Sequence, residues 1–189
     1  MIGWFTAVDL YCERTTAAFW AEPLKALSNL AFLAAALWAT FDSRKRQVND
    51  PLIRLLISMA GLVGLGSFLF HSFGNVWASY ADTVPIWSFV AVYIATAMQR
   101  IGGVKASRIM VIALGVGAAL TVLTLASSDG STGPAAADTL NGSGQYAPAV
   151  IALLVFAALT QYRRHPARHW VAASAATFLA SLVFRTIDL

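Results

Sequence analysis

The sequence predicts an all-α polytopic membrane protein, and three observations support this fold class. Of the 189 residues, 58% are hydrophobic and only 12% are charged, whereas a soluble domain carries about 25% charged residues. The apolar residues gather in six runs, each long enough to cross a hydrocarbon core of about 30 Å. The basic residues lie between these runs, as in the loops of membrane proteins. Helices are expected, because an open sheet would leave backbone groups unpaired in lipid.

Six spans are predicted along the chain. They lie near residues 24–41, 52–73, 82–99, 108–126, 147–162 and 170–187, after an external N-terminal segment at residues 1–23. In the second span, Gly61, Gly64 and Gly66 favour the close approach of a neighbouring helix. Residues 127–146 are rich in Gly, Ser and Ala, which is typical of a linker. We expect one integral-membrane domain over residues 1–189.

The distribution of charge predicts the orientation of the spans. Ten of the thirteen basic residues fall in or beside the first, third and fifth loops, and these are Arg44, Lys45, Arg46, Arg54, Arg100, Lys105, Arg108, Arg163, Arg164 and Arg168. By the positive-inside rule these loops are cytoplasmic and the N-terminus is extracytoplasmic. We expect the membrane to be a bacterial plasma (inner) membrane. The basic residues form no single patch, so no nucleic-acid partner is expected.

Three polar residues stand out in the apolar stretch between Gly66 and Trp87. Ionisable groups at membrane depth are costly and are seldom present without a function. Ser67 and His71 are four residues apart, so on a helix they share one face, about 6 Å apart along the axis. We expect that helix to end near residues 72–73 and the next span to begin at Asp82, which leaves the chain room to return to the same membrane face. A hydroxyl, an imidazole and a carboxylate gathered there outline a metal-hydrolase site.

Each of these residues also has a simpler interpretation. Asp82 alone could be an interfacial charge at a helix start, where the helix dipole favours it. Ser67 alone could donate to the carbonyls of its own helix, and His71 could be satisfied by a neighbouring helix. The functional interpretation is favoured because the three occur together.

Other candidate metal ligands are weaker. His165 and His169 are also four residues apart, but they lie in the fifth loop, which the charge pattern places at the membrane face opposite to His71. Pro166 disfavours a regular helix through both. We interpret them as part of a basic interfacial loop. The single cysteine, Cys12, excludes a cysteine-based zinc site.

Three motifs spread along almost the whole chain resemble one family. They are Tyr11-Cys12-Glu13 with Glu22 and Ser28-Asn29, then Gly66-Ser67-x-x-x-His71 with Asp82 and Pro85-x-Trp87, and finally Phe184-Arg185-Thr186-Ile187-Asp188. In this order they resemble the alkaline ceramidases. These are seven-helix intramembrane hydrolases of the superfamily that includes the adiponectin receptors.

The resemblance implies a catalytic zinc. In that family, zinc is held by one histidine of the second helix and two histidines of the last helix, in an H-x-x-x-H pattern. It implies His71 as a zinc ligand, Asp82 as the residue that orients the zinc-bound water and takes its proton, and Ser67 as a donor to the oxyanion. The sequence stops at Leu189, before any seventh span, so either the chain is truncated or the protein has lost this set of metal ligands. We expect a truncated chain whose complete form has a seventh span. This form is expected to be inactive or badly impaired.

The resemblance also implies a calcium ion on the external acidic cluster of Asp9, Glu13 and Glu22, because calcium prefers carboxylate and backbone oxygens. The match to the family departs at two points. Asp9 is displaced by one residue from the usual D-x-C-E pattern, and Lys25 stands where the family usually has asparagine. The carboxylates could therefore be solvated instead, and Lys25 could neutralise Glu22.

The activity implied is hydrolysis of the amide bond of ceramide, or of a related N-acyl lipid, to a fatty acid and an amine such as a sphingoid base. The lipid would enter the site sideways from the bilayer. The main alternative is a non-catalytic membrane receptor or lipid-binding scaffold. An H-x-x-x-H motif in the gene beyond Leu189 would favour the hydrolase.

The predicted topology can be tested with single cysteines placed in the N-terminal segment or in the fifth loop. In intact cells, an impermeant thiol reagent is expected to label the first and not the second, because only the N-terminal segment is extracytoplasmic. Labelling of the fifth-loop cysteine from outside would contradict the orientation.

Overall fold

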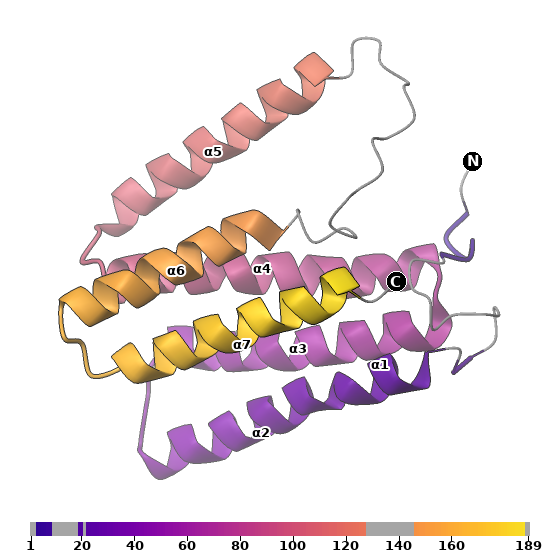
Figure 1. The fold of residues 1–189 in the computed structure, drawn as a ribbon, viewed down its shortest axis with the longest axis horizontal. Helices are drawn as coiled ribbons and strands as arrows, with labels where there is room; N and C mark the ends of the chain where they lie inside the picture. The colour runs from indigo at the N-terminus through magenta and orange to yellow at the C-terminus, as the bar shows by residue number, and fades with distance from the viewer. Residues whose placement is uncertain (1–2, 9–18, 21, 128–145, 188–189) are drawn as a thin grey trace. The chain divides into compact units, whose positions relative to one another are not determined.

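The computed structural model describes residues 3–8, 19–20, 22–127 and 146–187, and the regular elements among them are helices (Figure 1). These are α1 (Pro23–Ser28), α2 (Leu30–Lys45), α3 (Pro51–Phe73), α4 (Val76–Arg100), α5 (Ala106–Ser127), α6 (Ala147–Tyr162) and α7 (Arg168–Ile187). By their contacts the residues form two compact units, Met1–Tyr93 and Ile94–Leu189, which are described separately below.

The predicted all-α membrane architecture is confirmed. Within the described ranges, three helical segments are long and apolar enough to cross a membrane, namely Pro23–Lys45, Pro51–Phe73 and Val76–Arg100. Ala106–Ala118 and Ala147–Tyr162 are shorter apolar helices. Every predicted span falls on helical residues. The crossing of the membrane by all six, and a seventh span in the complete protein, stay predictions.

Two boundaries differ from those predicted. The first span continues to Lys45 and is interrupted at Asn29, where α1 passes into α2. The third span begins at Val76 instead of near residue 82, so that Asp82 lies inside α4. The interpretation of Asp82 as a charge at the start of a helix is therefore wrong.

The earlier start of α4 has a physical reason in its first turn. Helices begin where partners exist for their first N–H groups, which lack carbonyls within the helix. Asn75 Oδ1 accepts from the Ala78 amide at 3.2 Å, as a capping residue does. The N-terminal segment supplies the other acceptors, since the Thr6 carbonyl accepts from Val76 N at 3.1 Å and the Trp4 carbonyl from Trp77 N at 3.0 Å.

A tight turn joins α3 to α4. Gly74 adopts the left-handed conformation with φ 55°, which glycine enters without steric cost, and its amide donates to the Phe70 carbonyl at 2.8 Å. Ser67 lies seven residues before this glycine and Asp82 eight residues after it. At 1.5 Å per residue, both lie about 10–12 Å from the turn. The turn therefore sets the two side chains at matching depths on adjacent helices.

The α1–α2 segment packs along α3 (Figure 1). A Cβ added at Gly64 would lie 2.8 Å from Phe32 Cβ and 3.1 Å from the Asn29 carbonyl oxygen, closer than van der Waals contact. At Gly61 the same test gives an ordinary 3.6 Å contact with Ala36 Cβ. The predicted role of these glycines in close helix packing is confirmed at Gly64 against the α1–α2 segment and at Gly66 against α4.

In the second unit, α6 packs against α7. Ala97, at the end of α4, forms a buried cluster with Phe156 of α6 and Val171 of α7. The Arg163 guanidinium, just after α6, donates to the Ile101 carbonyl at 2.8 Å.

Candidate functional site

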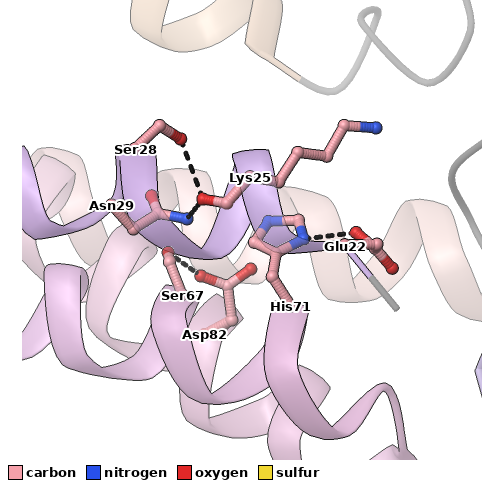
Figure 2. A network of polar contacts seen from close by, with 7 residues as sticks. All are labelled: Glu22, Lys25, Ser28, Asn29, Ser67, His71 and Asp82. Carbon is pink, nitrogen blue, oxygen red and sulfur yellow. Dashed lines mark hydrogen bonds and ion pairs between the residues drawn. The ribbon is translucent and has the colours of Figure 1, made fainter. Parts of the chain in front are cut away.

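The first contact of the site joins α3 to α4. The Ser67 hydroxyl donates a short hydrogen bond to Asp82 Oδ1 (Figure 2). Ser67 is buried and Asp82 is partly buried. A hydrogen bond to an ionised oxygen is stronger than one between neutral groups, so this contact holds the carboxylate in place from the neighbouring helix.

Gly66 makes that contact possible. A Cβ added at Gly66 would overlap the Ala81 carbonyl oxygen and would lie 3.2 Å from the Asp82 Cα. Pro85 lies inside α4 and has no N–H to donate to the carbonyl four residues before it, which is the carbonyl of Ala81. The backbone of α4 at this carbonyl therefore faces a glycine of α3, and only glycine fits there.

The second contact of the site joins α3 to the start of α1. Glu22 Oε2 lies 2.5 Å from His71 Nδ1. Glu22 is the N-cap residue of α1, just before Pro23, and is 1% exposed, while His71 is 8% exposed. The imidazole and the carboxylate are thus buried together, although 49 positions separate them in the chain.

The junction between α1 and α2 lies beside these residues (Figure 2). Ser28 Oγ and Asn29 Nδ2 both donate to the Lys25 carbonyl, at 2.8 Å and 2.9 Å. These bonds close the last turn of α1. The Ser28-Asn29 pair of the sequence motif therefore shapes the helix junction that lies against α3.

Of the residues predicted to form the site, Ser67, His71 and Asp82 all lie in the first unit and in one polar network (Figure 2). Asp9 and Glu13, the other predicted calcium ligands, lie outside the described residues, and calcium stays a prediction.

Sequence reasoning missed the contact between Glu22 and His71. A signal for it existed, since a carboxylate at the start of the first span and a histidine near the end of the second reach the same membrane face. That signal places the two residues at one membrane face but does not pair them, because 49 positions separate them in the chain.

The donor types suit zinc in part. Zinc takes imidazole nitrogen and carboxylate oxygen, which His71 and Asp82 provide. However, the described part of the chain contains no group of three or more His, Cys, Asp or Glu side chains that could hold a metal ion. In the second unit, His165 Nδ1 accepts from the Ala167 amide and His169 Nε2 lies 3.1 Å from Arg168 Nε.

A comparison with protein families matches the part of the chain that contains this site. The model of the family described as Ceramidase matches residues 6–188, which include every residue of the site. The chain belongs to the Ceramidase family. That membership supports a ceramide-hydrolysing function in general and a hydrolase that acts on an amide bond, in a membrane protein with a lipid substrate. Searches of curated proteins and of solved structures gave no match.

Gly66→Ala tests the close approach of α3 and α4. The added methyl group is expected to lower the free energy of unfolding by about 1–3 kcal/mol, as overpacking does, and to separate Ser67 from Asp82. Thermal or denaturant unfolding in detergent measures the loss. Gly61→Ala in the same helix is the matched control and is expected to be nearly neutral, since its Cβ meets only Ala36 at 3.6 Å. Equal losses for both variants would contradict this account.

Proposed function

We propose that this protein hydrolyses the amide bond of ceramide, or of a related N-acyl lipid, and releases a fatty acid and a sphingoid base or similar amine. The observation that carries the proposal is the polar network of a Ceramidase family member. Its hydroxyl, carboxylate and imidazole come from Ser67, Asp82 and His71. Polar groups that converge within an apolar helical frame are costly, and this supports a catalytic role.

Asp82 is the general base of the proposed reaction. Water adds to the carbonyl carbon, Asp82 accepts one of its protons, the C–N bond breaks, and the amine leaves with that proton. The Ser67 hydroxyl orients the carboxylate through its hydrogen bond. The same hydroxyl is the proposed donor to the oxygen that becomes negatively charged, which requires its hydrogen to turn from Asp82 to the substrate.

We propose zinc as the cofactor, with His71 among its ligands. When bound, zinc supplies a Lewis acid that polarises the amide carbonyl and activates water. A catalytic zinc usually has three protein ligands, and the described residues do not contain such a set. The remaining ligands are proposed to be the H-x-x-x-H pair that the resemblance implies.

The proposed site faces the extracytoplasmic side. The α3–α4 turn joins the N-terminal segment there, and this segment is on the outside by the positive-inside rule. A ceramide-like lipid would enter from the bilayer with its polar head near that face.

In a version extended through any further helix that its gene encodes, Asp82→Asn is expected to lower kcat for release of the sphingoid base by about 100-fold or more, because general bases contribute about 10²–10⁴-fold. His71→Ala is expected to abolish zinc-dependent hydrolysis. Mass spectrometry of the products measures both. His169→Ala, an exposed histidine in the second unit, is the control and is expected to keep activity. Loss of activity with His165→Ala or His169→Ala, together with full activity of His71→Ala, would show that the proposed site is wrong.

The number of zinc ligands available leads to a separate prediction. The 189-residue chain is expected to bind zinc weakly and to hydrolyse N-acyl-sphingosine poorly, because its described residues offer only His71 and Asp82 from the polar network, and two ligands orient a metal ion badly. A version extended through any further helix that its gene encodes is expected to bind zinc at close to one equivalent and to be active. Zinc stoichiometry and hydrolysis are measured side by side. Extended protein that binds the lipid but never hydrolyses it would favour a scaffold.

A further inference from the structure

We infer that Glu22 is a positioning residue for His71. Its carboxylate sets the rotation of the imidazole ring and decides which ring nitrogen carries the hydrogen. The contact is direct, with Oε2 2.5 Å from Nδ1, and it joins α1 to α3 (Figure 2). The resemblance had assigned Glu22 to calcium, so this is a different role for the same side chain.

Burial makes the contact a constraint on both residues. Glu22 is 1% exposed and His71 is 8% exposed, and ionisable groups this deep are stable only when paired. If either side chain rotated away, the other would remain buried without this partner. The ring orientation of His71 is therefore tied to the backbone at the start of α1.

The chain before α1 is anchored so that Glu22 reaches α3. Trp20 adopts a left-handed conformation with φ 68°, which is unusual for a residue with a side chain. Its ring packs edge-on against Phe68, at a centroid distance of 5.9 Å, and the ring of Phe19 packs in the same way against Phe73, at 5.2 Å. Their partners, Phe68 and Phe73, lie on α3 before and after His71 in the sequence. The two ring contacts therefore fix the residues just before Glu22 against α3.

The contact also selects the tautomer. With Glu22 as a carboxylate, which only accepts hydrogen bonds, the inferred pair has the hydrogen on His71 Nδ1, which donates it to Glu22 Oε2. In the neutral ring, Nε2 then carries the lone pair, on the side turned away from Glu22 (Figure 2). Histidines that bind metals commonly donate their other ring N–H to a carboxylate. Presentation of Nε2 to zinc rests on the proposed function, whereas the ring orientation does not.

The test uses the full chain in lipid nanodiscs, labelled with ¹⁵N-histidine and free of metal. The ring signals of His71 are assigned by their loss in His71→Gln. The wild-type spectrum is expected to show a protonated Nδ1. In Glu22→Gln, the amide either accepts from Nδ1 or donates to it, so the spectrum is expected to show both tautomers while His165 and His169 stay unchanged. Asp42→Asn is the control, because it removes a carboxylate that pairs with Arg46 at 2.8 Å on the surface, and no His71 change is expected.

A second measurement is zinc affinity by chelator competition, which is expected to fall about 10–100-fold in Glu22→Gln. Unchanged His71 signals in Glu22→Gln would overturn the inference. If calcium affinity were lost in that variant with the His71 signals unchanged, Glu22 would be a calcium ligand instead. Altered His71 signals, together with no hydrolysis of N-acyl lipid by a version extended through any further helix that its gene encodes, would support the inference and overturn the proposed function.

Discussion

The close approach of α3 and α4 at Gly66 is the constraint on which the rest of the site depends. Glycine is required because any Cβ would overlap the Ala81 carbonyl, and Pro85 is the residue that cannot donate to that carbonyl. Together with the Gly74 turn, this backbone contact sets Ser67 opposite Asp82 at the same depth. The hydrogen bond between them is thus a consequence of backbone geometry and does not have to bring the helices together by itself.

A polar network in an apolar frame is stable only if its members are paired. The network has two pairs, Ser67 with Asp82 and Glu22 with His71, and both include α3. Leaving a buried donor or acceptor without its hydrogen-bond partner costs about 1–3 kcal/mol, so truncation of either Glu22 or His71 would be felt in stability as well as in function.

The described residues before α1 contact the helices that carry the candidate site. The carbonyls of Trp4 and Thr6 accept from the first amides of α4, and the aromatic residues that follow hold Glu22 against α3. The start of α4 and the position of Glu22 therefore both depend on residues outside the predicted spans. Hydropathy gives no information about such contacts, because they are made by backbone carbonyls and ring edges.

The amino-acid sequence by itself determined the helical membrane class and the order of the apolar helices, because apolar length is a local property. It also singled out Ser67, His71 and Asp82 as candidate site residues, which the structure brings into one polar network. The sequence predicted Asp82 at the start of a helix. In the structure α4 begins earlier, at Val76, partly because the distant carbonyls of Trp4 and Thr6 accept from its first amides. Only the tertiary structure decided that Glu22 pairs with His71. A contact between residues 49 positions apart produces no periodic pattern in the sequence. It arises from the packing of α1 on α3.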